Sequence, residues 1–394
     1  MQPIFAEARS LLEKNEPFVL ASVVRTKGST PQKPGAKLLV RRDGTFNGTL
    51  GGGCVEAEVW AEARSILEAA TSGEVSQPAT PQLRHFELNE EIAAQDGLVC
   101  GGTMEILIEP LVSEPRLIPL FDEILEAYEG RGDRALATCV RTGASSDPSS
   151  RLFVRADGTR VGSLGDAPLD DLAANAALEQ MPRGREQWLE VPEAAEGQTT
   201  QIYVEAFTHP ATLVIAGGGH VGKALYSLAC FLGFRTIIVD DRSQFANKER
   251  FPEADRIIVD AFDRGLREVG MGPNHFVVVA TRGHKLDDVA LLEAARSNAS
   301  YVGLLGSKRK AVLIFRSLYQ AGISESRVRQ IRAPVGLDIG GRQPEEIAVS
   351  ILAEIVAVRN ERTGGSMTVD DNVVSKVKKI AGRDIVETRL QGRE

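Results

Sequence analysis

The chain has 394 residues, of which 43% are hydrophobic and 25% are charged, and its formal net charge is -8. Its length exceeds the roughly 250 to 300 residues that one hydrophobic core serves, so at least two domains are expected. The acidic balance argues against nucleic acid and anionic membranes as partners, and no apolar run approaches the roughly 20 residues of a membrane span. Because the N-terminal segment also lacks the apolar core of a signal peptide, a cytoplasmic protein is expected.

The N-terminal quarter predicts one α/β unit that closes near residue 110. Its expected elements are a helix at 3–14, strands at 18–26 and 37–44, a helix at 55–70, and strands at 85–88 and 103–111. The second strand ends in an Asp-Gly turn, and a loop rich in glycine and proline joins it to the first.

Two cysteines of this unit stand beside glycines. Cys54 follows Gly51–Gly53 and opens the helix, where the helix dipole and unpaired amides lower the pKa of a thiol. Cys100 precedes Gly101–Gly102, whose amides can form a nest for an anion. A single cysteine is more often buried and inert, but two glycine-flanked thiols in one unit favour a functional pair. Lys37 is either a contact for an anionic ligand or a solvated strand lysine.

The next hundred residues repeat the pattern of the first unit. ALATCVRTGAS from Ala135 parallels VLASVVRTKGS from Val19, and RLFVRADGTRVGSLGD from Arg151 parallels KLLVRRDGTFNGTLGG from Lys37. The offset is 116 residues in the first pair (135 against 19) and 114 in the second (151 against 37), which fits a two-residue deletion. A helix at 169–180 and a strand at 201–207 complete the second copy, so an internal duplication is expected.

The two copies differ in one loop. The second copy keeps the strands and the Asp-Gly turn, but Asp166-Ala167-Pro168 stands where the first has glycines and Cys54. It also has no Cys-Gly-Gly. Since the framework is retained without these loop residues, they are expected to serve chemistry rather than folding, and the site is assigned to the first copy.

From residue 211 the pattern changes to short apolar runs that alternate with helices. The runs are 212–219, 236–241, 256–260, 276–282 and 301–307. Continuous apolar runs of this length are typical of buried parallel strands, and five of them with intervening helices predict a doubly wound sheet.

The first of these strands leads directly into Gly217-x-Gly219-x-x-Gly222 and a helix, the context that makes this fingerprint specific. Gly217 permits the tight turn, Gly219 lets the backbone approach a phosphate, and Gly222 lets the helix pack closely. Asp240 ends the second strand, where an acid binds ribose hydroxyls. A phosphate-bearing ligand is favoured over an inherited turn that binds nothing, and NAD(P) is one candidate for it.

Further candidates follow the fourth and fifth strands, at the edge where open α/β sheets bind ligands. Arg282 and His284 follow the fourth strand. The fifth strand is followed by residues 306–310, which include Ser307 and Lys308. This segment either cradles a phosphate or begins a solvated helix. His220, in the glycine loop, either contacts the ligand or is solvated. The candidate cofactor-binding residues are Gly51, Gly52, Gly53, Cys54, Cys100, Gly101, Gly102, Gly217, Gly218, Gly219, His220, Gly222, Asp240, Arg282, His284, Ser307 and Lys308. No metal-ligand spacing occurs, so no dedicated metal site is expected.

The expected fold is α/β, with a C-terminal Rossmann-like doubly wound parallel sheet preceded by a mixed-sheet α/β domain that carries the duplication. The expected domains are 1–110 with the two cysteine loops, 111–209 as a degenerate second copy, 210–360 as the Rossmann-like domain, and 361–394 as a tail.

Nine segments in one order resemble the XdhC/CoxI family of xanthine dehydrogenase accessory proteins. They are GSTPQKPGAKLLV, GTLGGGCVEAEV, GLVCGGTMEILIEP, VIAGGGHVGKAL, IVDDR, FANKERFPEAD, TRGHKLD, YVGLLGSKRK and PVGLDIGGRQPEEIAVSILAEI. The resemblance extends from about residue 17 to 359 and implies a maturation factor that binds molybdenum cofactor (molybdopterin), protects it or supports its sulfuration, and delivers it to a xanthine dehydrogenase type of enzyme. It makes Cys54 and Cys100 the catalytic and cofactor-site candidates and the Gly217 loop a second ligand region.

The partners expected with this reading are the client molybdoenzyme, a cysteine desulfurase and a second copy in a homodimer. A cofactor-binding chaperone is favoured over a catalyst. The alternative is an NAD(P)-dependent oxidoreductase that uses the C-terminal fingerprint, but no Tyr and Lys four residues apart on a helix complete a hydride-transfer site. A purely structural assembly partner is the third reading.

Overall fold

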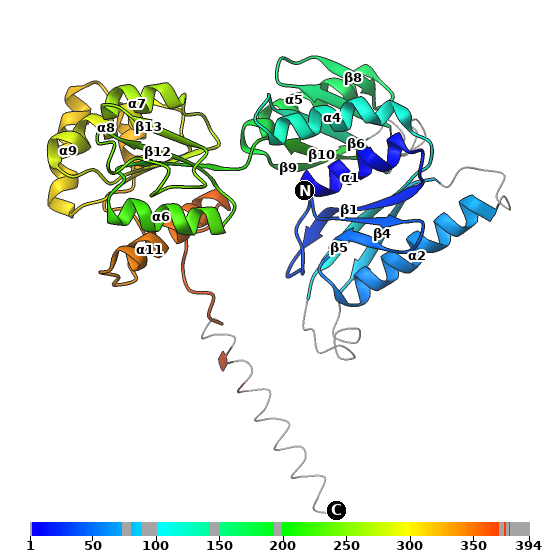
Figure 1. Cartoon of the computed structure of the whole chain (residues 1–394). Coiled ribbons are helices and arrows are strands. Elements are labelled where there is room, and N and C mark those ends of the chain that lie inside the picture. The colour runs from blue at the N-terminus through cyan, green and yellow to red at the C-terminus, as the bar shows by residue number, and fades with distance from the viewer. Residues whose placement is uncertain are drawn as a thin grey trace, which may run out of the picture. The chain divides into compact units, whose positions relative to one another are not determined.

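The computed structural model describes residues 2–72, 80–88, 101–141, 150–192 and 199–369, with residues 374, 375 and 378 beyond them. The chain divides into two compact units (Figure 1). The first comprises Met1–Ala211 and Gly272–Asn274, and the second comprises Thr212–Met271 and His275–Glu394. No helix among the described residues is long and apolar enough to cross a membrane.

The first unit contains two five-stranded sheets with the same strand order. Sheet A, in the order β3-β2-β1-β5-β4, consists of β1 (Phe18–Lys27), β2 (Lys37–Arg41), β3 (Phe46–Gly48), β4 (Gln82–Glu87) and β5 (Thr103–Leu111). Sheet B, in the order β8-β7-β6-β10-β9, consists of β6 (Arg134–Arg141), β7 (Arg151–Arg155), β8 (Arg160–Ser163), β9 (Glu186–Pro192) and β10 (Thr199–Phe207).

The α/β class is confirmed, but the strand pairs of these two sheets are antiparallel rather than mixed throughout the described residues. The physical reason lies in the connections. β1, β2 and β3 follow one another through short loops, as do β6, β7 and β8, and a short loop joins neighbouring strands only in antiparallel fashion.

Among the described residues, helices form layers with these sheets (Figure 1). α2 (Gly53–Ser72) packs on the outer face of sheet A, and α5 (Ala167–Gln180) packs on the outer face of sheet B. α1 (Gln2–Glu13) and α4 (Ile118–Tyr128) pack against each other between the sheets, where the rings of Phe5 and Phe121 meet edge to face at 5.4 Å. Residues 2–111 are called the first copy below, and residues 118–207 the second copy.

Helix α4 was not among the expected elements. It extends the duplication, because it has the same place before β6 that α1 has before β1. Its signal was present in the sequence: Leu117, Phe121, Ile124 and Tyr128 recur at helical spacing and face the layer between the sheets. The Asp-Gly turns also match, since Gly44 and its counterpart in the second copy have φ angles of 82° and 84°.

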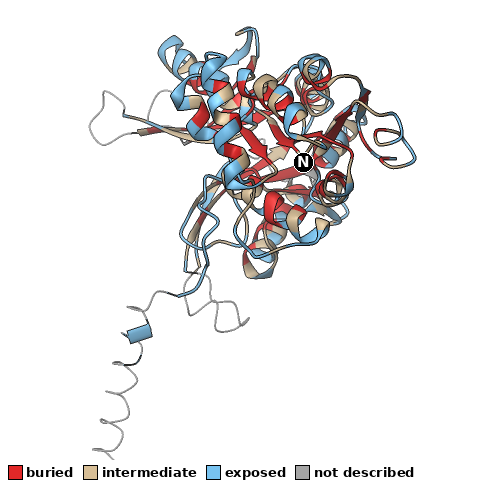
Figure 2. Cartoon of the chain, turned by 90° about the vertical axis from the view of Figure 1, so that its left-hand side faces the viewer, coloured by how far each residue is buried: buried red, intermediate tan, exposed pale blue. Residues whose placement is uncertain are grey.

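Side-chain alternation along the strands builds the core of this unit. Val19, Ala21 and Val23 of β1 point towards α2, and Leu20 and Val24 point towards the second copy. Figure 2 shows the same division for the chain as a whole, with buried residues concentrated in the strands and exposed residues on the outward surfaces of the helices.

The second unit is a parallel five-stranded sheet in the order β13-β12-β11-β14-β15, as the apolar runs predicted. Its strands are β11 (Thr212–Ala216), β12 (Arg235–Asp240), β13 (Arg256–Val259), β14 (His275–Val279) and β15 (Tyr301–Leu304). Its helices are α6 (His220–Phe231), α7 (Phe262–Val269), α8 (His284–Arg296), α9 (Lys308–Gln320), α10 (Glu325–Gln330) and α11 (Pro344–Arg359). The strand order reverses between β11 and β14, which creates the crevice where such sheets bind ligands.

Candidate functional site

The glycine-cysteine loop lies between β3 and α2. Its three glycines, Gly51 to Gly53, all have positive φ angles, of 110°, 73° and 66°, which other residue types rarely adopt. Cys54 is half-buried in the first turn of α2 and forms no disulfide. The Glu56 carboxylate accepts hydrogen bonds from Leu50 N at 2.7 Å, Gly52 N at 3.2 Å and the Thr49 hydroxyl at 2.7 Å. Partial burial opposes the charge of Glu56, but these hydrogen bonds lower its pKa.

Three loops meet beside this helix start. A Cβ atom on Gly102 would lie 2.5 Å from the Ser29 carbonyl oxygen, and one on Gly51 would lie 2.5 Å from Pro31 Cβ. Glycine is therefore required for both loops to approach the loop that joins β1 to β2. In contrast, a Cβ on Gly52 or Gly101 would meet no atom within 4 Å. Each loop thus has one glycine that packs and one that faces open space. Cys100 lies outside the described residues.

The corresponding loop of the second copy has its own carboxylate at the helix start. Asp170 accepts from Leu164 N at 2.7 Å, as Glu56 does from Leu50 N, which fixes the alignment. Asp166, at the position of Gly52, accepts a hydrogen bond from Leu169 N at 2.8 Å and caps α5. The first copy has no side chain at that position, so the space beside Gly52 is open, although the amides of Leu50 and Gly52 already donate to the Glu56 carboxylate.

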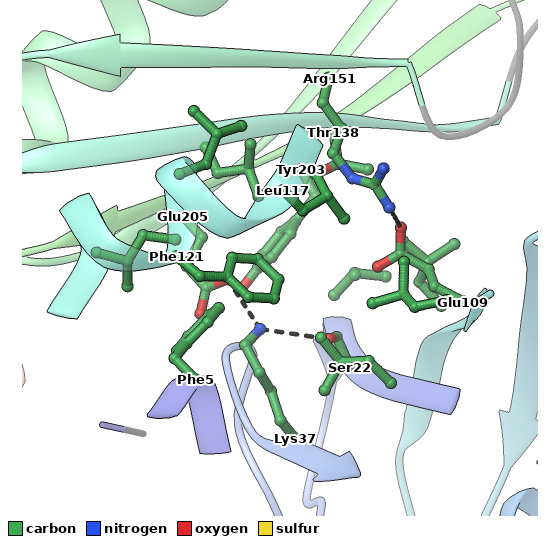
Figure 3. Close-up of a pocket in the computed structure, with 17 residues that line it drawn as sticks. Phe5, Ser22, Lys37, Glu109, Leu117, Phe121, Thr138, Arg151, Tyr203 and Glu205 are labelled. Atoms are coloured by element: carbon green, nitrogen blue, oxygen red, sulfur yellow. Dashed lines mark hydrogen bonds and ion pairs between the residues drawn. The ribbon is translucent and has the colours of Figure 1, made fainter. Parts of the chain in front are cut away.

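Neither alternative expected for Lys37 is correct. Its side chain is 3% exposed, and its ammonium group pairs with Glu205 of the second copy at 2.8 Å and donates to the Ser22 hydroxyl at 3.2 Å (Figure 3). Lys37 points into the layer between the sheets because it begins β2 on the face opposite α2.

A second ion pair crosses the same layer in the reverse direction. Arg151 of the second copy pairs with Glu109 of the first at 2.6 Å (Figure 3). Lys37 and Arg151 are the first residues of β2 and β7, and Glu109 and Glu205 lie opposite the third residues of β1 and β6. The two pairs are therefore related by the duplication. The two ion pairs line a cavity of about 40 Å³, which is large enough for two or three water molecules. The charges of the four side chains neutralise one another.

The glycines of the fingerprint divide into packed and open positions. A Cβ on Gly217 would lie 2.2 Å from the Ala280 carbonyl oxygen, and one on Gly222 would lie 2.0 Å from the Gly217 carbonyl oxygen. Gly218 is equally constrained by the backbone of Phe245. A Cβ on Gly219 would meet no atom within 4 Å, and Gly219 precedes α6 without a side-chain cap. The backbone amides at the start of α6 are therefore accessible to an anion, beside the exposed His220.

Asp240 does not fit the expected role as a ribose acceptor. Its side chain is fully buried and accepts from Gly218 N at 2.9 Å, from Arg242 N at 3.0 Å and from the Arg242 guanidinium at 2.9 and 3.0 Å. Burial opposes its charge, but these bonds lower its pKa. The sequence could not reveal that Arg242 turns back onto Asp240 and occupies its acceptor positions.

The remaining candidates lie at the carboxyl edge of the parallel sheet, as expected from their positions after β14 and β15. Arg282 forms a two-pronged pair with Asp241 at 2.9 and 3.0 Å. His284 begins α8, half-exposed and 3.5 Å from the Asp288 carboxylate. Ser307 caps α9 through Lys310 N at 3.3 Å, and Lys308 is exposed.

Asp287 is a buried charge that the sequence did not single out. It accepts a hydrogen bond from the Thr281 hydroxyl at 2.8 Å and pairs with Lys310. Lys310 of the expected basic cluster therefore holds the edge together rather than facing a ligand. Across the described part of the chain, no group of three or more His, Cys, Asp and Glu side chains is arranged to hold a metal ion.

Comparison with known proteins gives two matching family models. Residues 213–355 match the XdhC Rossmann domain, and residues 11–77 and 128–192 match the XdhC and CoxI family. The two segments that match the second model fall in the two copies of the duplicated unit.

Three curated relatives are similar over most of this chain. Escherichia coli YqeB, described as uncharacterized, is 27% identical over 365 residues, which cover 92% of this chain but only 48% of YqeB. A Bacillus subtilis protein described as a probable xanthine dehydrogenase subunit is 27% identical over 89% of this chain and 96% of its own. The molybdenum cofactor insertion chaperone PaoD of Escherichia coli is 25% identical over 86% and 83%.

Among solved structures, a Bacillus halodurans protein described as a xanthine dehydrogenase has a similar fold. Its TM-score is 0.62 at 25% sequence identity, and the match covers 91% of this chain and 98% of the other.

Proposed function

Because the chain belongs to the XdhC and CoxI family, we propose that it is an accessory factor that binds molybdenum cofactor and delivers it to a molybdoenzyme of the xanthine dehydrogenase type. The relatives named as a molybdenum cofactor insertion chaperone and as a probable component of xanthine dehydrogenase support this role. The observation that carries it within this chain is the helix start of α2. There Gly52 faces open space in the first copy, whereas the second copy fills the same position with the capping side chain of Asp166.

The residues around that helix start fit the chemistry of the cargo. Molybdenum cofactor combines an anionic phosphate with a soft, sulfur-bound metal. The first-turn amides of α2 suit the anion, whereas the Gly51 and Gly52 amides already donate to Thr49 and Glu56. The Cys54 thiol in the same turn suits a soft metal or its sulfur. Gly101, which faces open space, completes the proposed site from the other loop, and Cys100, which precedes it in the sequence, is proposed as the second thiol. Protection of the bound cofactor, and its sulfuration with a cysteine desulfurase as sulfur source, belong to the same proposal.

The start of α6 is the second proposed ligand region, for a phosphate-bearing group. Gly219→Val places a branched side chain in the open space above the loop, and we expect it to lower ligand affinity at least tenfold without unfolding the unit. Calorimetry with NAD+ and with molybdenum cofactor checks this, and circular dichroism controls for the fold. Unchanged affinity for every ligand that binds the wild-type chain would contradict the role of this loop.

An NAD(P)-dependent oxidoreductase is less well supported. The acid at the end of β12 is saturated by Arg242 and Gly218, so it leaves no acceptor for a ribose hydroxyl. If the chain were such an oxidoreductase, NAD(P) rather than a pterin would accompany the purified protein.

The deciding experiment identifies the small molecules that the full-length chain carries. Protein purified from cells grown with molybdate is denatured, and the released compounds are identified by mass spectrometry while molybdenum is measured separately. The loaded protein is then mixed with cofactor-free xanthine dehydrogenase, and the recovery of xanthine oxidation is followed. We expect a pterin phosphate, stoichiometric molybdenum and recovery of activity. A chain that neither binds cofactor nor activates the enzyme would disprove the proposal.

A further inference from the structure

The loop that joins β1 to β2, residues 28–36, touches both glycine loops of the first copy. Gly51 packs on Pro31, and Gly102 packs on the backbone of Ser29. At its base, Gly35 N donates to the Val23 carbonyl oxygen, and Val23 N donates to the Ala36 carbonyl oxygen, each at 2.9 Å. Any displacement of the 28–36 loop would therefore change the separation of the two glycine loops.

Both ends of this loop are held by the second copy. Before the loop, Arg25 pairs with Glu190 at 2.8 Å, and its guanidinium lies 5.2 Å from the centre of the Trp188 ring. At the far end, a Cβ on Gly35 would lie 2.6 Å from the Glu186 carboxylate. Glu190, Trp188 and Glu186 all belong to β9, the edge strand of sheet B.

The alternation of a strand explains how one edge makes all three contacts. Glu186, Trp188 and Glu190 are two residues apart, so their side chains leave β9 on the same face. Tyr203, opposite Trp188 in β10, packs with Val24 and Leu107 of the first copy and brings that face against sheet A.

We infer that the second copy acts as a positioning element for the site of the first, with Glu190 and Trp188 of β9 as positioning residues that fix the 28–36 loop and, through it, the two glycine loops. This gives the copy without a cysteine loop a role that depends on its framework alone. The inference rests on the proposed function only for the identity of the ligand; the positioning itself concerns contacts within the chain.

A charge swap tests the positioning without removing any side chain from the core. The variants are Arg25→Glu, Glu190→Arg and the combination of the two. The control is Arg160→Glu, which breaks another exposed ion pair of the same unit, 2.6 Å from Asp171 and away from the 28–36 loop. Two readouts need no bound ligand: amide hydrogen exchange in residues 28–36 and 49–56, and the rate at which iodoacetamide alkylates Cys54 at pH 7.

We expect each single variant to raise both rates about two- to fivefold, the range available from one exposed pair, and the swapped pair to restore them. The control should change neither rate. Unchanged rates in both single variants, or no recovery in the double variant, would overturn the inference.

Retention of molybdenum cofactor, measured in parallel, separates this inference from the proposed function. If the rates follow the charge swap while no variant, including the wild type, retains the cofactor, the positioning stands and the proposed ligand is wrong. If the wild type retains the cofactor but the rates ignore the swap, the ligand stands and the positioning is wrong.

Discussion

The first copy begins its outer helix with Gly51-Gly52-Gly53-Cys54, whereas the second begins the same helix with Gly165-Asp166-Ala167-Pro168. Around these four positions the copies agree. Glu56 and Asp170 bind the backbone before the helix in the same way, and both sheets have one strand order. An aspartate cap and a proline in the first turn are ordinary helix-starting residues, and three left-handed glycines are not.

The difference teaches that the fold does not need Gly52 and Gly53, while Gly51 is kept as Gly165 with a similar positive φ of 122°. The second copy reaches the same strand order with a conventional helix start, so the first copy retains a costly one. Each glycine also increases the freedom of the unfolded chain, which the folded state must overcome. A loop that costs stability and is dispensable for folding is a sound place to look for function. The predictions below test this division between shared framework and unshared site.

The largest effect is expected in the shared framework. Lys37→Met leaves Glu205, whose side chain is 8% exposed, as a buried charge without its partner, and such a loss costs about 3–5 kcal/mol. Trp60 and Trp188 are the two tryptophans of the chain and both lie in the first unit. Their fluorescence in a urea titration of the full chain therefore follows this unit alone.

The related pair provides the controls. Arg151→Met should cost less, because Arg151 is 17% exposed and Glu109 is 10% exposed, so water partly compensates the orphaned charge. Lys37→Met combined with Glu205→Leu should recover most of the stability. A double variant as unstable as Lys37→Met alone would mean that packing, rather than charge, holds the layer.

The second prediction concerns a variant in which the glycine-cysteine loop of the first copy is made more like the corresponding loop of the second copy. Gly52→Asp places a carboxylate at the position of Asp166, where it competes with an external anion for the start of α2. We expect retention of molybdenum cofactor to fall by about two orders of magnitude, because a buried or partly buried like charge costs several kcal/mol in a site of this kind.

Gly52→Asn is the matched control, since it has the same shape without the charge and tolerates the positive φ comparably. The aspartate variant should lose more than ten times as much affinity as the asparagine variant. Equal losses would show that backbone strain, and not anion competition, accounts for the effect.

The third prediction compares two thiols. Cys139 lies in β6, buried against α5, at the position that Val23 holds in the first copy, and Cys54 is half-buried at its helix start. Cys139→Ser should lower the free energy of unfolding by about 1–3 kcal/mol, because it buries a hydroxyl among apolar side chains. Cys54→Ser should leave stability nearly unchanged and weaken cofactor retention.

Cys139→Val is the control, since the first copy already accommodates valine there, and it should cost less than about 1.5 kcal/mol. Alkylation at pH 7 should label Cys54 before the buried Cys139. It should also label Cys54 before Cys230 of α6, because burial raises the pKa of the Cys230 thiol. Normal cofactor retention and client activation by Cys54→Ser would leave the backbone amides at the start of α2 as the site.

Much of the fold could be predicted from the sequence because its signals are local. Apolar runs gave the parallel strands, matching segments gave the duplication, and Gly217-x-Gly219-x-x-Gly222 gave the turn into α6. The contacts within the site depend on distances that a sequence does not contain. Lys37 meets Glu205 across 168 positions.

The same limit explains two further misses. Arg242 saturates Asp240 through a turn that no spacing rule predicts, and the 28–36 loop lies between two glycine loops from different parts of the chain. Neither a ligand contact nor a solvated position for Lys37 was correct, because its burial depends on which face of β2 the second copy covers.

The smallest effect is expected at the turns that the copies share. Asp43 accepts from Thr45 N at 2.9 Å and from the Thr45 hydroxyl at 2.6 Å, and Asp157 accepts from Thr159 at 2.9 and 2.7 Å. These hydrogen bonds, led by the one from the threonine hydroxyl, lower the pKa of each aspartate. A carboxyl group whose pKa is lowered by folding adds stability above its ordinary pKa of roughly 4, and that contribution disappears as the pH falls through the lower, folded-state value.

Asp43→Ala and Asp157→Ala should therefore reduce stability slightly and equally at pH 7, and the difference from wild type should shrink below pH 4. Urea titrations at pH 7 and pH 3 measure both, and a clear inequality between the two variants would show that the copies do not share their framework as closely as the turns suggest.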